Sequence, residues 1–218
     1  MRIKYSKLSP YQVKKLLHCF CEDLTATQTA RLTGINRNTV NRYYRLFREK
    51  ITAYQEEQAQ QHGFTGEIEL DESYFGGKNR GKRGRGTAKI PVFGLFRRNG
   101  RVYTQIIKNA TAAQIRPIIR KFVIPGSRIY TDRWRAYDGL VLNGYEHHRI
   151  DHDQGGYSDR RGGHINGIES FWSFAKRRLL RFNGIRAQAF YGHLKECEFR
   201  FNERDHLYQK ILSILTVS

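Results

Sequence analysis

The order of strand-forming and helix-forming segments after residue 66 constrains the fold of this chain more than any other feature. Three segments rich in β-branched and aromatic residues come first, and Asn99-Gly100, a strong hairpin signal, separates the second from the third. Helical spacing then alternates with two further strand-like segments. A hairpin meander followed by crossover units predicts an α/β fold, with a mixed five-stranded sheet and flanking helices. The predicted strands are residues 67–75, 90–98, 101–109, 127–134 and 145–152, and the predicted helices are residues 111–123, 135–142, 165–180 and 187–202.

Residues 1–55 carry apolar residues at helical spacing and are predicted to form a separate helical domain. Ser9-Pro10 is typical of a helix start, because serine caps the first turn and proline fits its first position. Gly34 interrupts the pattern and supplies a turn between two later helices. The predicted helices run from Pro10 to about Cys21, from Thr27 to Leu32, and from Asn36 or Asn38 to about Lys50.

The boundary between the two predicted domains is a polar segment, residues 56–66, that ends in glycine-bounded turn chemistry. The charge pattern also changes in this region. Residues 51–77 contain six acidic residues and no Lys or Arg, whereas residues 78–89 contain six basic residues and no acid. We therefore predict a helical domain over residues 1–55, a linker over 56–66, and an α/β domain over 67–218 that includes the C-terminal helices.

The net charge of the chain is +19, from 39 Lys and Arg against 20 Asp and Glu. Charge of one sign destabilises a compact chain by self-repulsion, which a polyanionic partner relieves. Nucleic acid is the favoured partner, because neutralising phosphates releases condensed counterions. An anionic membrane is the alternative, but no amphipathic anchor or apolar run of about 20 residues is found in the sequence. Because Cys19, Cys21 and Cys197 are not paired, we expect a reduced, cytoplasmic, nucleoid-associated protein.

The segment around Gly34 is typical of a DNA-reading helix-turn-helix. Such a unit needs a small residue where the helices approach, a glycine turn and inward apolar residues, and Ala30, Gly34 and Val40 meet these needs in order. The outward side chains at the start of the second helix are Asn and Arg, which suit bidentate contacts with adenine and guanine. These predicted DNA-binding residues are Asn36, Arg37, Asn38, Asn41 and Arg42. The alternative is a plain helical hairpin with a solvated polar face.

A glycine-rich basic segment, GGKNRGK at residues 76–82, has the outline of a phosphate-binding P-loop. That motif requires Ser or Thr after its lysine, and Arg83 stands there instead, before a predicted strand rather than a helix. A loop that follows the DNA backbone is therefore favoured over a nucleotide site, with a plain hairpin tip as the alternative. Its predicted DNA-binding residues are Lys82, Arg83 and Arg85.

Three carboxylates lie on separate predicted elements of the α/β domain. Asp71 lies within the first strand, Asp132 ends the fourth, and Glu169 follows Asp132 by 37 positions on a helix. An acid among apolar neighbours needs a compensating partner, and a bound cation is one. Magnesium prefers oxygen ligands, and two ions about 4 Å apart stabilise both the attacking and the leaving oxygen of a phosphodiester. Any one of these acids alone is more simply a strand-end or surface residue, but their order along the chain favours a metal site.

Three segments resemble motifs of DDE-type bacterial insertion-sequence transposases of the small ISXO-like group. They are DESYFGGK (71–78), IYTDRWRAY (129–137) and GGHINGIESFWSFAKRRL (162–179). The resemblance covers about residues 66–205 and implies that residues 67–218 form a ribonuclease H-like (retroviral-integrase-like) catalytic domain. It implies that Asp71, Asp132 and Glu169 hold two Mg²⁺ ions, for which Mn²⁺ can substitute. It also implies that Lys176 is a basic catalytic residue that contacts the element end.

The resemblance implies a DNA transposase that binds double-stranded DNA, both the terminal repeats of its own element and the target. Water would nick the DNA to free a 3′-hydroxyl, which then attacks target DNA, and a homodimer or larger synaptic oligomer would hold both ends. Two alternatives are a nuclease or resolvase of similar fold that cuts without joining, and a non-catalytic DNA-binding regulator. At the third metal position, Asn166 lies one helical turn from Glu169 and is the alternative ligand, although a carboxylate binds Mg²⁺ more strongly.

Overall fold

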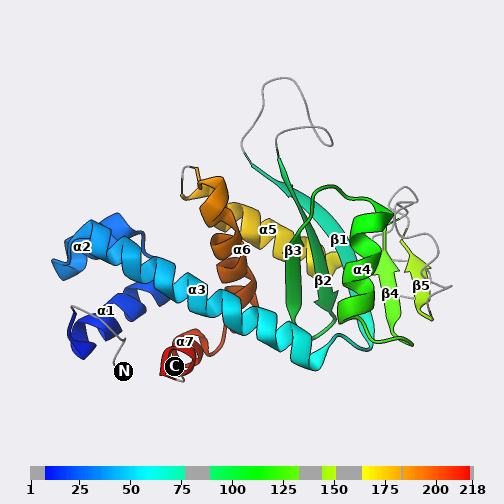
Figure 1. Ribbon diagram of the computed structural model, residues 1–218, viewed down its shortest axis with the longest axis horizontal. Helices are drawn as coiled ribbons and strands as arrows, with labels where there is room; N and C mark the ends of the chain where they lie inside the picture. The colour runs from blue at the N-terminus through cyan, green and yellow to red at the C-terminus, as the bar shows by residue number, and fades with distance from the viewer. Residues whose placement is uncertain (1–7, 77–88, 133–143, 151–163, 183, 217–218) are drawn as a thin grey trace. The chain divides into compact units, whose positions relative to one another are not determined.

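The computed structural model describes residues 8–76, 89–132, 144–150, 164–182 and 184–216, and Figure 1 shows its elements. The helices are α1 Pro10–Cys21, α2 Ala26–Thr33, α3 Arg37–His62, α4 Ala112–Phe122, α5 Asn166–Leu180, α6 Ala187–Asn202 and α7 Leu207–Thr216. The strands are β1 Glu67–Phe75, β2 Ile90–Arg97, β3 Val102–Ile106, β4 Arg128–Thr131 and β5 Glu146–Arg149. The helix predicted over residues 135–142 lies outside the described residues.

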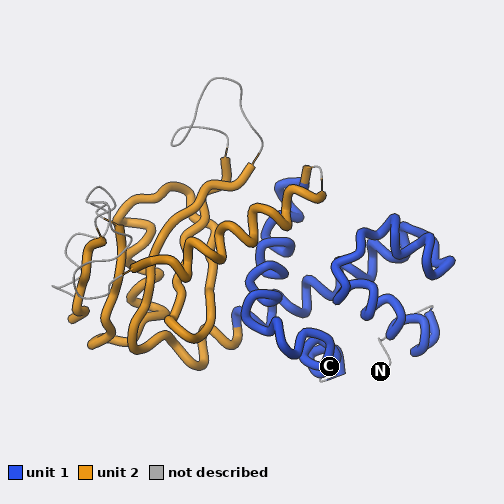
Figure 2. The backbone as a smooth tube through the Cα atoms, turned by 180° about the vertical axis from the view of Figure 1, so that it is seen from behind, with its two compact units in different colours: residues 1–56, 185–218 blue, residues 57–184 orange. Residues whose placement is uncertain are grey.

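The chain forms two compact units, coloured separately in Figure 2. The first unit comprises residues 1–56 and 185–218, and the second comprises residues 57–184. Residues 185–218 therefore join the N-terminal helices, and not the α/β domain with which they were predicted. Part of the predicted linker is also helical, because α3 continues to His62. No Gly or Pro interrupts residues 51–62, so nothing local ends the helix before that point.

Local capping chemistry sets the starts of the N-terminal helices. Ser9 and Gln12 form a capping box at the start of α1, and the helix begins at Pro10 as predicted. Helix α2 begins earlier than predicted, because Thr25 rather than Thr27 caps it through a reciprocal pair with Gln28. Gly34 then adopts the left-handed conformation, with φ +72°, and its N–H donates to the carbonyl of Ala30. This geometry favours glycine and turns the chain into α3.

The first unit has a core built from both ends of the chain. Its buried apolar residues come from α1, α3, α6 and α7, and include Leu17, Phe47, Phe199, Ile211 and Leu215. Ion pairs are buried along with them. Glu196 on α6 accepts from Arg48 on α3 at 2.7 Å and from Arg200 at 2.9 Å, and its side chain is 1% exposed. Because a buried charge is costly without a partner, this arrangement fixes how α6 packs against α3.

The second unit contains a five-stranded sheet in the order β3-β2-β1-β4-β5 among the described residues. β1 pairs antiparallel with β2, β2 pairs antiparallel with β3, and β1, β4 and β5 run parallel. Asn99 has a positive φ of +55° in the β2–β3 turn, consistent with the predicted hairpin. The order confirms the predicted α/β fold class, a mixed five-stranded sheet with flanking helices.

The two faces of the sheet bear different chemistry because successive strand residues point to opposite sides. On one face, Ile68 and Leu70 of β1 join Ile115 and Ile119 of α4 in an apolar core. On the other face, the carboxylate of Glu69 accepts from the α5 backbone and that of Asp71 accepts from Trp172 of α5. The polar side of β1 is therefore the side that α5 covers.

We predict that Phe199→Ala destabilises the first unit by roughly 3–5 kcal/mol, because it removes a fully buried aromatic side chain and leaves a cavity between helices from both ends of the chain. Urea unfolding, followed by circular dichroism, measures the change. Leu180→Ala is the control, since that side chain is 77% exposed and its loss is expected to cost no more than about 0.5 kcal/mol. Equal stability of the Phe199→Ala variant and the wild type would show that α6 does not contribute to this core.

Candidate active site

The pairing of two neighbouring parallel strands, β1 and β4, leads toward Asp71 and Asp132. The register of β1 with β4 pairs Glu67 with Arg128 and Glu69 with Tyr130. Two residues further along the same register come Asp71 and Asp132, the latter one residue past the end of β4. Neighbouring strands lie about 4.8 Å apart, so this register brings two acids from distant parts of the sequence to one edge of the site.

Asp71 lies beneath helix α5 at a close contact between helix and sheet. Its partner on β2 is Gly94. A Cβ atom at Gly94 would lie 2.5 Å from the ring of Trp172, so glycine leaves the space that this indole fills. The indole Nε1 donates to Oδ2 of Asp71 at 3.0 Å, and Phe75 packs edge-on against the same ring at 5.9 Å. The Asp71 carboxylate is thereby oriented by a side chain that itself has little freedom.

Glu169 lies in the first turn of α5, and its side chain is exposed. Asn166, the alternative metal ligand, begins the same helix and is also exposed. The opposite side of the helix packs inward through Ile168, Phe171 and Ala175. Both candidate third ligands therefore lie on the outward side of α5.

The electrostatics couple the three acids. Burial, together with the nearby carboxylates of Asp132 and Glu169, raises the pKa of Asp71 to about 7, against hydrogen bonds from the Glu72 backbone and from Trp172. Burial also lowers the pKa of Lys176, while Asp71 counteracts that shift. Mutual repulsion among acids disfavours their charged forms. The other three predicted catalytic side chains, Asp132, Glu169 and Lys176, therefore lie within electrostatic reach of Asp71.

Oxygen ligands that repel one another suit a divalent cation, which would remove the repulsion. Asp71, Asp132 and Glu169 fit this requirement by chemistry and by their electrostatic coupling. In the described part of the chain, however, no three His, Cys, Asp or Glu side chains are gathered closely enough to enclose a metal ion.

A fourth carboxylate, Glu69, belongs to this region but was not predicted from the sequence. It lies two residues before Asp71 on the same side of β1 and is fully buried. It accepts from the backbone of Ile168 at 2.9 Å and from Arg98 at 3.1 Å. Its alternation with Asp71 along a strand is the one sequence feature that could have indicated it.

The predicted DNA-binding residues of the first unit line the start of α3, and all five are exposed: Asn36, Arg37, Asn38, Asn41 and Arg42. Ile35 and Val40, between them in the sequence, are buried, as the predicted inward face requires. Asn36 also has a structural role, because its Oδ1 accepts from the N–H of Asn38 at 2.8 Å. The other predicted DNA-binding residues, Lys82, Arg83 and Arg85, lie outside the described residues.

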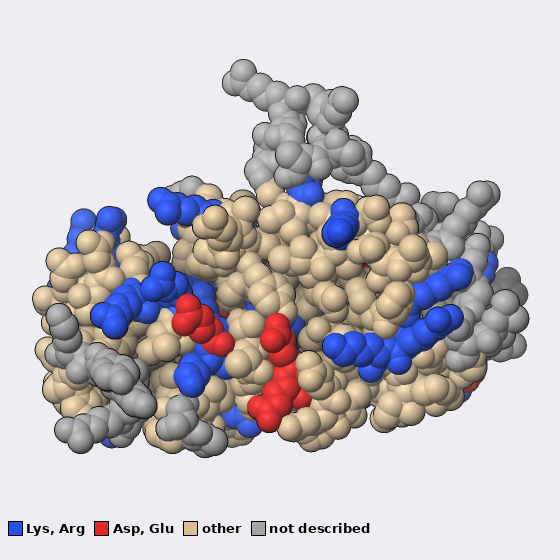
Figure 3. Space-filling model, viewed as in Figure 1, with Lys and Arg blue, Asp and Glu red and all other residues tan. Residues whose placement is uncertain are grey.

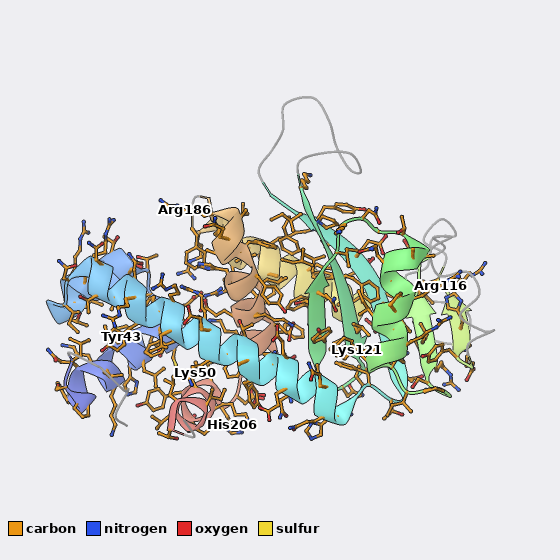
Figure 4. All side chains as sticks on the ribbon, viewed as in Figure 1. Tyr43, Lys50, Arg116, Lys121, Arg186 and His206 are labelled. Carbon is orange, nitrogen blue, oxygen red and sulfur yellow. The ribbon has the colours of Figure 1, made fainter. Side chains whose placement is uncertain are left out.

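The second unit has a strongly basic surface. Between Ser73 and Thr131 the sequence contains no Asp or Glu. Figure 3 shows Lys and Arg side chains on the α4 side of this unit, and Figure 4 shows Arg116 and Lys121 on α4. Lys108 and Arg120 are also exposed. None of the described helices is long and apolar enough to cross a membrane.

The sheet, α4, α5 and α6 all fall within the match to one known domain family. The family model described as the ISXO2-like transposase domain matches residues 63–202. Because this match spans more than half of the sequence, the chain belongs to the ISXO2-like transposase family, and the predicted resemblance is confirmed.

Two curated proteins and two solved structures are similar to the chain. A Haemophilus influenzae protein described as transposase-like and uncharacterized is 44% identical, over 48% of this chain and 84% of that protein. A Halobacterium salinarum protein, described as uncharacterized and in transposable element ISH50, is 29% identical, over 62% of this chain and 52% of that protein. The catalytic core domain of BIV integrase has a TM-score of 0.45 and 14% identity, over 68% and 95% of the two chains. The Mos1 strand transfer complex has a TM-score of 0.33 and 13% identity, and the match covers 98% of this chain and 81% of that chain.

We predict that Asp71→Asn raises the melting temperature at pH 8 in the presence of a chelator. The raised pKa means that the folded state binds this proton more tightly than the unfolded state does. This group therefore costs no stability below pH 4, and its cost grows as the pH rises from about 4 to about 7. The advantage of the variant over the wild type should accordingly grow over that range and level off above it. A melting-temperature difference that does not change between pH 4 and pH 8 would contradict the prediction.

Proposed function

We propose that this protein is the DNA transposase of an insertion sequence, which nicks its element ends with water and joins the freed 3′-hydroxyl to target DNA. The observation that carries the proposal is the parallel register of β1 and β4, which leads to Asp71 and Asp132. Two acids from neighbouring strands, beside a helix that bears a third, support metal-dependent phosphodiester chemistry. Membership of the transposase family supports DNA as the substrate.

Asp71, Asp132 and Glu169 would hold two Mg²⁺ ions, with Mn²⁺ as a substitute. When bound, such ions lower the pKa of water and stabilise the charge that develops on the phosphate oxygens. Trp172 would keep the carboxylate of Asp71 in one orientation through its 3.0 Å hydrogen bond. Lys176, which is within electrostatic reach of Asp71, would contact a phosphate of the element end.

The proposed reaction has two balanced steps. First, a water oxygen attacks phosphorus at the element end, a P–O bond forms, and the P–O3′ bond breaks to free a 3′-hydroxyl. Next, that hydroxyl attacks a target phosphodiester, and a new P–O3′ bond forms as the target's own P–O3′ bond breaks. The first step hydrolyses one phosphoester bond, with the proton of water passing to the 3′-oxygen, and the second exchanges one phosphoester bond for another, so no nucleotide or redox cofactor is required.

DNA recognition is assigned to the first unit. The exposed Asn and Arg side chains at the start of α3, with apolar residues packed beneath them, support a helix-turn-helix that reads the terminal repeats. The basic surface of the second unit supports additional contacts with phosphates, which carry no sequence information. Because two element ends must be joined to one target, the active assembly would be a homodimer or larger oligomer on DNA.

The triad is tested by cleavage of a labelled element-end substrate in Mg²⁺. Asp71→Asn is expected to abolish cleavage and strand transfer while end binding persists, because the carboxylate is needed for cations and not for base contacts. Glu169→Gln is expected to reduce cleavage by orders of magnitude, since an amide offers Mg²⁺ only a dipole. Asn166→Ala, one turn away on the same exposed side of α5, is the matched control and should have a smaller effect. A larger loss of cleavage in Asn166→Ala than in Glu169→Gln would identify Asn166 as the third metal ligand.

The reading residues are tested by competition binding between element-end and unrelated DNA. Asn41→Ala or Arg42→Ala is expected to reduce discrimination by about 1–3 kcal/mol, because a base contact is lost. Arg45→Ala is the control on the same helix, where the exposed Arg45 lies 3.7 Å from Glu49. It should weaken binding to both DNAs alike. Unchanged discrimination in both test variants would show that these side chains form a solvated helix face and do not read DNA bases.

A further inference from the structure

Glu69 is the most enclosed charged group near the candidate active site. Its side chain is 0% exposed, although it lies on a strand between two other acids, Glu67 and Asp71. Strand alternation puts it on the same side of β1 as Asp71, which is the side covered by α5. A carboxylate held this far from water needs specific partners.

One of these partners is the N-terminus of α5. The residue in the cap position of that helix, Ile165, makes no side-chain capping hydrogen bond. Instead, the third N–H of the helix, from Ile168, donates to Oε2 of Glu69 at 2.9 Å. Glu69 therefore caps α5 from another element, and its negative charge also complements the positive end of the helix dipole.

The approach of α5 to this cap depends on a glycine. A Cβ atom at Gly167 would lie 2.0 Å from the ring of Phe96 and 2.9 Å from Oε2 of Glu69. Any larger residue would push the first turn of α5 away from the sheet. Because Glu169 lies in this same turn, its distance from Asp71 depends on how closely the turn sits.

Arg98 holds the Glu69 carboxylate in place. Its Nε donates to Oε1 of Glu69 at 3.1 Å, and another nitrogen donates to the carbonyl of His164, just before α5, at 2.6 Å. The guanidinium also lies 3.8 Å from the ring centre of Tyr130 on β4. The ion pair of Arg98 and Glu69 therefore connects β1 and β4 to the start of α5. These strands lead to Asp71 and Asp132, and α5 bears Glu169.

We propose that Glu69 is a positioning residue, which sets the separation of the first and third carboxylates by capping α5 from β1. This inference rests on the proposed function for its catalytic consequence. The cap itself is independent of that function, since it consists of contacts within the protein. The carboxylate of Glu69 is occupied by protein partners, and Glu69 acts through the helix that carries Glu169.

Glu69→Asp tests the reach of the cap, because it keeps the charge but shortens the side chain by one methylene. Amide hydrogen exchange at Ile168 is expected to accelerate at least about tenfold. The Mn²⁺ concentration for half-maximal cleavage of an element end is expected to rise about tenfold, equivalent to ~1.4 kcal/mol, with end binding unchanged. Glu69→Gln, which keeps the length and a hydrogen-bond acceptor, should remain closer to the wild type in both measurements. If Glu69→Asp does not fold, Gly167→Ala tests the same contact with the same expected changes, because its Cβ atom would push the first turn of α5 away from the Glu69 carboxylate.

Glu67→Asp is the matched control. Glu67 lies on the same strand and also contacts Arg98, at 3.5 Å, but its side chain is 42% exposed and no described contact joins it to α5. The Glu67→Asp variant should have the same amide exchange at Ile168 and the same Mn²⁺ requirement as the wild type. Unaltered exchange in Glu69→Asp would overturn the cap, whatever the cleavage result. Faster exchange with an unaltered Mn²⁺ requirement would overturn the positioning role. A wild-type protein that never cleaves would instead refute the proposed function, and the exchange experiment would still test the cap.

Discussion

The close packing of α5 on β1 and β2 is the contact on which the rest of the candidate active site depends. Two glycines permit it: Gly94 leaves room for Trp172 above the sheet, and Gly167 brings the first turn of the helix against Phe96. Hydrogen bonds from α5 to Asp71 and Glu69 then fix the helix along the strand. Because protein interiors are close-packed, a displacement of this helix cannot be absorbed without moving the acids that it carries or contacts.

The same contact explains the electrostatics of the site. Covering Asp71 with an aromatic side chain removes water from its carboxylate, and burial is the main cause of its raised pKa. Two further acids in its neighbourhood act in the same direction. Such a group is unfavourable in the protein alone and becomes favourable when a cation neutralises it. The fold thus brings two further acids within electrostatic reach of Asp71, in a chain whose net charge is +19.

The chain also divides its tasks between units that are not contiguous in sequence. The C-terminal helices return to the N-terminal helices, where Phe199 enters the apolar core and Glu196 pairs with Arg48 and Arg200. The unit proposed to read DNA is therefore completed only by residues that follow the α/β domain in the sequence. Removing residues 185–218 would expose its core as well as shorten the chain.

The sequence by itself determined the order of the five strands and of α1 to α6, the start of α1 after Ser9, the Asn99-Gly100 hairpin and the three candidate acids. Capping, turn formation and periodicity depend on residues a few positions apart, so a local pattern records them. Only the tertiary structure decided that α6 and α7 join the first unit and that Glu69 is a buried cap. Glu69 and Ile168 lie 99 positions apart, and Arg48 and Glu196 lie 148 apart. A buried ion pair or a cap supplied by another strand leaves no periodicity in the sequence, because its energy arises only when distant segments exclude water together.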